Sequence, residues 1–142
     1  MLNIDELKDI ASEYSAEVRT GNYPYCAWNN NETFNSGKWS GKFFSNEVKE
    51  GYKATIYMTD DLNPFGFFHE LGHVKDYIEG KTFINTWADE VSAWCNAVDF
   101  MKEYDIAYSN IDLLEFLQEN LSTYEHNPLL WDEAISKIFK VK

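Results

Sequence analysis

Apolar positions at both ends of the chain repeat with the spacing of amphipathic helices. Near the N-terminus this pattern predicts a helix from Leu2 to Thr20, with Asp5 as its cap and Gly21 as its stop. Its apolar stripe consists of Leu7, Ile10, Ala11, Tyr14 and Val18. We interpret this segment as a packing helix without chemistry of its own.

The second half of the chain predicts four more helices. Asn63-Pro64 begins the first of them and Gly80 ends it, since Asn suits the N-cap, Pro the first helical position and Gly the C-terminal stop. The next runs from about Asn85 to Tyr104, and the last two begin at Ser109 and at Asn127-Pro128. The core-facing stripe of the first of the four is Phe67, Leu71, Val74 and Ile78.

Between Asn22 and Thr59 the helical spacing gives way to turn residues, aromatics and short alternating runs. The clearest run places Tyr52, Ala54, Ile56 and Met58 on one face of a strand and polar side chains on the other. The predicted fold class is therefore α+β: an N-terminal helix, a small and mostly antiparallel sheet, and a helical C-terminal half.

Composition narrows the class of protein. With 142 residues, 44% of them apolar, the chain is expected to form one globular domain over residues 1–142. The 24 acidic and 12 basic residues give a net charge of −12, which argues against direct nucleic-acid binding because phosphate contacts need clustered Lys and Arg. The charge suits either a basic partner or substrate, or solubility alone.

No segment of this sequence predicts export or a membrane span. Its start, Met1-Leu2-Asn3-Ile4-Asp5-Glu6, has neither the basic nor the apolar region of a secretory signal, and no apolar run approaches the roughly 20 residues of a membrane span. Two cysteines are too few for a disulfide framework. We therefore expect a cytoplasmic protein.

The candidate metal-binding and catalytic residues lie in the segment Phe67-Phe68-His69-Glu70-Leu71-Gly72-His73-Val74, which contains a complete H-E-x-x-H motif. On a helix, residues four apart differ by about 40° in direction and by roughly 6 Å along the axis, so both imidazoles can reach one metal ion. Glu70 then points to the flank where a metal-bound water would sit. This arrangement predicts a Zn²⁺ site.

A catalytic zinc usually has three protein ligands, so a third must follow downstream. The candidates are Asp76, Glu79, Asp89, Glu90 and His126. Glu90 falls on the apolar stripe of its helix, between Trp87 and Trp94, where a carboxylate is costly unless a cation compensates its charge. Glu90 is the predicted ligand and Glu79 the next candidate, whereas Asp89 is expected to face solvent.

His69-Glu70-Leu71-Gly72-His73, followed by Asp89-Glu90-Val91-Ser92-Ala93-Trp94-Cys95, resembles the gluzincin pattern of zinc metallopeptidases. Among these the chain is most similar to the small intracellular peptidases of the ImmA/IrrE type. The resemblance implies a zincin-like fold, with His69, His73 and Glu90 as zinc ligands and Glu70 as general base. It covers these two helices only.

The expected reaction is hydrolysis of a peptide bond by a metal-bound water, with Glu70 taking the proton and passing it to the leaving amine. A further donor would stabilise the transition state, and His126, Tyr124 and Tyr57 are candidates that the sequence leaves open. Asp76 either orients a ligand imidazole or faces solvent. By analogy with zincins, Lys53–Thr59 is expected to be the edge strand that binds substrate.

Two functions remain open at this point. The first is a zinc-dependent endopeptidase that cuts a specific intracellular protein, such as a transcriptional repressor. The second is a non-catalytic acidic protein of phage or mobile-element type, which binds or inhibits a basic partner and uses zinc only for structure. A structural site has no need of a general base at Glu70, so this residue distinguishes the two.

Overall fold

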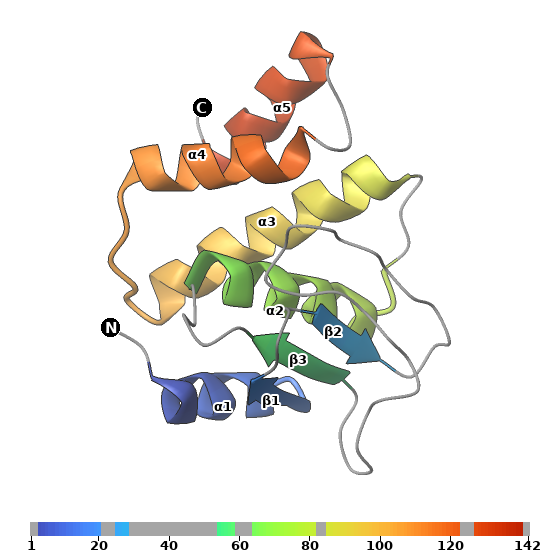
Figure 1. The fold of residues 1–142 in the computed structure, drawn as a ribbon. Helices are drawn as coiled ribbons and strands as arrows, with labels where there is room; N and C mark the ends of the chain where they lie inside the picture. The colour runs from blue at the N-terminus through green and yellow to red at the C-terminus, as the bar shows by residue number, and fades with distance from the viewer. Residues whose placement is uncertain are drawn as a thin grey trace.

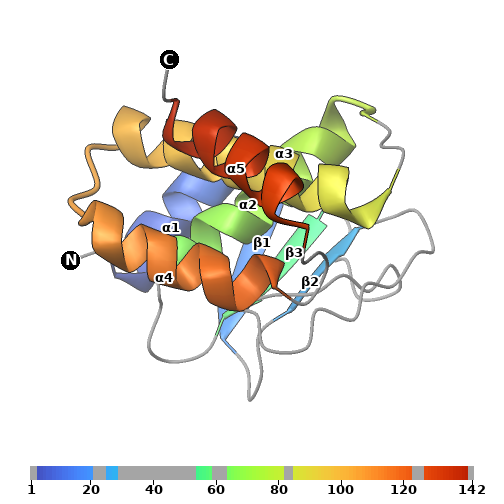
Figure 2. The same cartoon turned by 90° about the horizontal axis from the view of Figure 1, so that it is seen from above.

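A computed structural model gives the fold and describes residues 3–20, 25–28, 54–58, 64–81, 85–122 and 127–140. Its elements, in chain order, are α1 (Ile4–Ser12), β1 (Ala16–Thr20), β2 (Tyr25–Trp28), β3 (Ala54–Met58), α2 (Pro64–Ile78), α3 (Thr86–Glu103), α4 (Asn110–Leu121) and α5 (Pro128–Phe139). Figures 1 and 2 show α2 between the sheet and α3, with α4 and α5 beyond α3. The α+β class is as predicted.

The N-terminal helix is shorter than predicted. It ends at Ser12, and a turn with Ser15 in the left-handed region (φ 56°) leads into β1. Its cap is Asn3, which forms a capping box with Glu6, and not Asp5. Val18 has the spacing of the helical stripe, but it also has the spacing of a strand. It lies two residues after Ala16, so both side chains point to the same face of β1, and both are buried. Packing against the rest of the fold therefore favours the strand.

The sheet is mixed, which corrects the prediction of a mostly antiparallel one. Its strand order is β1-β3-β2; β3 runs parallel to β1 and antiparallel to β2. A parallel pair needs a long connection, and the chain between Thr20 and Ala54, which includes β2, supplies it.

The segment predicted as a substrate-binding edge is the middle strand of this sheet. Ile56 is in register with Val18 on one side and Cys26 on the other, so both backbone edges of β3 are engaged. Thr55, expected on a polar face, is as fully buried as Ala54 and Ile56. The prediction for Lys53–Thr59 rested on analogy with zincins and was wrong, because β3 has a neighbouring strand on each side. Alternation along a strand reports its two faces and does not report how many strands pair with it.

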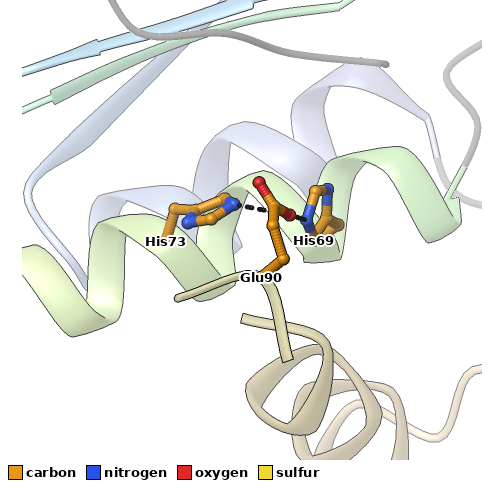
Figure 3. A group of neighbouring side chains, drawn as sticks. All are labelled: His69, His73 and Glu90. Atoms are coloured by element: carbon orange, nitrogen blue, oxygen red, sulfur yellow. Dashed lines mark hydrogen bonds and ion pairs between the residues drawn. The ribbon is translucent and has the colours of Figure 1, made fainter. Parts of the chain in front are cut away.

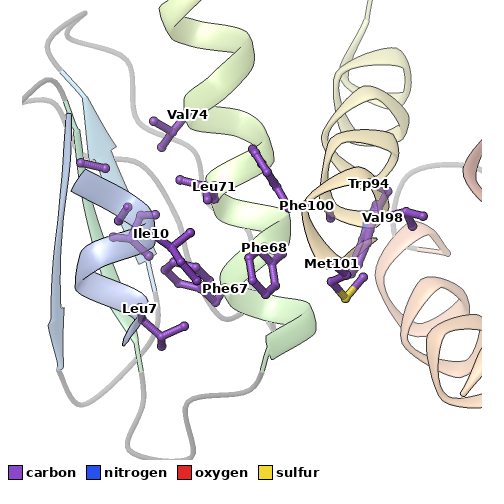
Figure 4. Packing of buried hydrophobic residues seen from close by; sticks show 14 of the residues in the cluster. Leu7, Ile10, Phe67, Phe68, Leu71, Val74, Trp94, Val98, Phe100 and Met101 are labelled. Atoms are coloured by element: carbon purple, nitrogen blue, oxygen red, sulfur yellow. The ribbon is translucent and has the colours of Figure 1, made fainter. Parts of the chain in front are cut away.

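The motif helix α2 is buried on nearly all sides. Every residue from Gly66 to Val74 is buried, whereas Ile78 at the end of the predicted stripe is only partly so. In Figure 4, Phe67 and Leu71 face α1 and the sheet, while Trp94, Val98 and Met101 extend from α3. Apolar side chains thus fill the sheet side of α2, and its histidines are left to face α3.

The described helices of the second half begin where they were predicted to begin. The side chains of Ser109 and Asn127 cap α4 and α5, and Asn85, which was predicted as the approximate start of α3, is its N-cap. Gly80, with φ 71°, follows the end of α2 in the left-handed conformation expected of a C-terminal stop. The predicted cap Asn63 lies outside the described residues. Among the described residues, none of the helices has the length and hydropathy that crossing a membrane would require.

Gly72 lets α2 and α3 approach at the level of the motif. A Cβ atom built on Gly72 would lie 2.3 Å from the backbone oxygen of Ala93, so the two helices could not keep this spacing with a larger residue. We expect Gly72→Ala to lower the free energy of unfolding by about 1–3 kcal/mol. Urea denaturation measures this, with the exposed Ser136→Ala in α5 as the control expected to change little. An unchanged midpoint for Gly72→Ala would contradict the close approach.

Candidate metal centre

His69, His73 and Glu90 meet in the interface between α2 and α3 (Figure 3). Nε2 of His69 lies 2.6 Å from Oε2 of Glu90, and Nε2 of His73 lies 3.2 Å from the same oxygen. One ligand atom from each residue lies within 4.8 Å of the others, and all three side chains are buried. Two imidazole nitrogens and one carboxylate oxygen therefore converge on one point.

Helix geometry brings these side chains together. His69 and His73 stand one turn apart on α2, with ring centroids 4.7 Å apart. Glu90 lies near the start of α3 and is only 4% exposed, so the prediction that it faces the core is confirmed. A buried carboxylate needs charge compensation, which the two imidazoles provide here.

His69, His73 and Glu90 shift one another's pKa values. Burial by itself would lower the pKa of both imidazoles, but Glu90, together with Glu70 at His69 and Asp89 at His73, raises it above the usual value of histidine. Burial would likewise raise the pKa of Glu90, yet His73 and His69 hold it well below its usual range. The site thus favours positive charge between the nitrogens and the carboxylate, whether carried by protons or by a cation.

The donor set fits zinc. Zinc binds histidine nitrogen and carboxylate oxygen at about 2.0–2.2 Å in tetrahedral geometry, which puts neighbouring ligand atoms about 3.3 Å apart. The separation of His73 from Glu90, 3.2 Å, already matches this value, and the 2.6 Å separation of His69 from Glu90 must widen by a fraction of an ångström. Three protein ligands of this kind are also the usual number at a catalytic zinc.

Glu70 is buried beside His69, but it does not lie on the side of the ring that faces Glu90, where a metal-bound water was expected. Its Oε2 lies 3.1 Å from Nδ1 of His69, whereas Glu90 lies at Nε2 on the opposite side of the same ring. From this position Glu70 can orient the His69 ring. To act as a general base, its carboxylate must reach the Nε2 side by rotation of its side chain.

Asp89 is not the solvent-facing residue that its helix phase predicted. Its side chain is 18% exposed, and Oδ1 lies 3.3 Å from Nδ1 of His73. Helix phase depends on α3 alone, but α3 packs so closely against α2 that two consecutive residues of α3, Asp89 and Glu90, contact the same imidazole.

The other downstream acids take structural roles. Asp76 is 2% exposed; its Oδ1 accepts a hydrogen bond from Asn96 Nδ2 (2.9 Å) and lies 3.5 Å from Lys81 Nζ. Asn96 also donates to the backbone oxygen of Gly72, so Asp76 and Asn96 tie α2 to α3. Neither role expected for Asp76 matches these contacts. Glu79 is partly exposed and pairs with Lys75 and Lys81.

Trp94 contributes to the site, which its sequence pattern did not lead us to predict. Its ring stacks on His69, with centroids 4.4 Å apart and an angle of 11° between the planes. Its Nε1 donates a hydrogen bond of 2.9 Å to Oδ1 of Asn120 in α4. The available signal was its spacing: Trp94 stands one turn after Glu90 on the same stripe and was assigned only to the core.

The predicted transition-state donors cannot be placed. His126 and Tyr124 lie outside the described residues, and so does the side chain of Tyr57, although its backbone belongs to β3. Comparison of the chain with protein-family models, curated proteins and solved structures finds no match.

Proposed function

We propose that this chain is a zinc-dependent endopeptidase of zincin-like fold. The observation that supports it best is the buried convergence of His69, His73 and Glu90, with a second buried carboxylate, Glu70, beside them. An arrangement of two helical histidines and a downstream glutamate, next to the acid of an H-E-x-x-H motif, suits metal-assisted hydrolysis.

Each residue has a role in this proposal. His69, His73 and Glu90 hold the zinc, which when bound supplies Lewis acidity that lowers the pKa of water and polarises a carbonyl oxygen. Glu70 accepts a proton from the attacking water and delivers it to the nitrogen of the departing amine. Trp94, stacked on His69, limits movement of that ring.

The substrate is proposed to be a protein or peptide with basic segments. The net charge of −12 would attract such segments and repel acidic ones. Nucleic acid and membrane are not proposed as partners. The low cysteine content supports action in the cytoplasm.

The position of Glu70 supports a second candidate function. A carboxylate at Nδ1 of a ligand histidine is the usual arrangement for orienting that ligand, and a structural zinc site would need no more of Glu70 than this. The chain would then be a non-catalytic acidic protein that binds or inhibits a basic partner.

The direct test is metal content followed by cleavage. The purified protein should contain close to one equivalent of zinc by elemental analysis, the number one site would hold. Incubation with a cell lysate should produce new protein termini, detected by mass spectrometry, that disappear with a chelator and return with added zinc. Zinc content without any new termini would favour the binding protein.

Zinc uptake by the metal-free protein is expected to release protons. Because the pKa of both imidazoles is raised, they retain protons at pH values where an ordinary histidine is neutral, and zinc binds only the neutral form. Affinity should therefore fall as the pH drops through these raised pKa values. Calorimetry in two buffers of different ionisation enthalpy, repeated over a range of pH, should give heats that differ more between the buffers as the pH falls. Heats that are equal in both buffers at every pH would contradict the expected release of protons.

A further inference from the structure

We infer that Asp89 is a positioning residue of the metal centre: it holds the His73 ring through Nδ1, so that Nε2 faces Glu90 and the metal. The inference rests on the proposed zinc site and adds a residue to it. Its basis is the 3.3 Å separation of Asp89 Oδ1 from His73 Nδ1, with Glu90 Oε2 3.2 Å from Nε2 of the same ring.

Both histidines have a carboxylate near each of their two ring nitrogens. Each ring has Glu90 at Nε2 and a different carboxylate at Nδ1: Glu70 at His69, 3.1 Å away, and Asp89 at His73. A carboxylate only accepts hydrogen bonds, and a neutral imidazole has one N–H. The carboxylate at Nδ1, Glu70 for His69 and Asp89 for His73, therefore keeps the N–H on that nitrogen. The lone pair of Nε2 is then left for the metal.

The simpler explanation for Asp89 is its place in the first turn of α3, where a negative charge favours the helix. That role needs no contact with His73 and would be satisfied by a side chain in open solvent. Instead the side chain is 18% exposed, and its oxygen lies at the one nitrogen of the ring that does not face Glu90. The two roles differ in what they predict for the histidine.

Three variants separate them. Asp89→Ala removes the acceptor, Asp89→Asn keeps an acceptor oxygen but removes the charge, and Asp99→Asn makes the same change of charge at an exposed position of α3. Zinc affinity is measured by competition with a chelator, which requires no substrate. The state of the His73 ring is measured from its nitrogen chemical shifts in the zinc-loaded protein.

We expect zinc to bind Asp89→Ala about 10–100-fold more weakly, the usual cost of losing such a partner. The nitrogen shifts of His73 should change, while those of His69 should change less. Asp89→Asn should lose less affinity than Asp89→Ala, and Asp99→Asn should match the wild type. If Asp89 only stabilised the helix, Asp89→Ala would lower the thermal stability of the protein and would leave the nitrogen shifts of His73 unchanged.

Wild-type zinc affinity and wild-type His73 shifts in Asp89→Ala would overturn the inference. If that variant fails to fold, Asp89→Leu decides in its place, because it keeps most of the volume of the side chain but has no acceptor: unchanged affinity and unchanged His73 shifts in Asp89→Leu would overturn the inference. A wild-type protein that binds no zinc would overturn both this inference and the proposed function. If Asp89→Ala binds zinc more weakly but neither the wild type nor any variant cleaves protein, the positioning role of Asp89 is supported and the endopeptidase function is rejected.

Discussion

Replacing Glu70 with glutamine is expected to leave zinc bound and to slow peptide cleavage by about 10²–10⁴-fold, the usual contribution of a general base. Glutamine keeps the size of the side chain and an oxygen that can accept a hydrogen bond from Nδ1 of His69, so the ring should keep its orientation. It cannot take a proton from water. The measurement is the rate at which new termini form in a lysate, alongside the zinc content of the same preparation.

The result also separates the two candidate functions. Zinc retained and cleavage lost would place Glu70 in the reaction. Zinc retained with biological activity unchanged would favour the non-catalytic binding protein, in which Glu70 only orients His69. A matched control is Glu79→Gln on the same helix, because Glu79 is partly exposed and pairs only with lysines among the described residues. It should behave as the wild type.

Replacing Glu90 with alanine is expected to reduce zinc affinity by more than the 10–100-fold that loss of an outer partner costs, because it removes a ligand itself. The substitution takes away the Glu90 oxygen that both Nε2 atoms approach, at 2.6 and 3.2 Å. Cleavage should disappear with the metal. Chelator competition measures the affinity, and Glu90→Gln, which keeps the volume but removes the charge, should also bind zinc weakly.

The control for Glu90 is Glu103→Ala, at the exposed C-terminal end of the same helix. It should bind zinc like the wild type. Tight zinc binding by Glu90→Ala would show that the ion is held elsewhere, and the proposed centre would have to be abandoned. Helix phase alone puts Asp89 in solvent and predicts that Asp89→Ala leaves zinc affinity unchanged. Because Asp89 contacts His73, we expect instead a loss of zinc affinity smaller than that of Glu90→Ala.

Features that depend on a single helix could be predicted from the sequence. The one-turn spacing of His69 and His73, the inward phase of Glu90, and the helix starts at Ser109 and Asn127 all follow from neighbours within a few residues along the chain. Periodicity encodes which side of a helix is apolar, and a carboxylate on that side signals a compensating charge. These local rules were enough to assemble the candidate ligands.

Features that depend on a partner across an interface were decided only by the tertiary structure. Val18 belongs to a strand because β3 pairs with it, and β3 is central because β1 and β2 occupy both of its edges. Asp89 reaches His73, and Trp94 stacks on His69, because Gly72 allows α2 and α3 to pack closely. The distance between two helices comes from packing the whole core, and no periodicity within one helix records it.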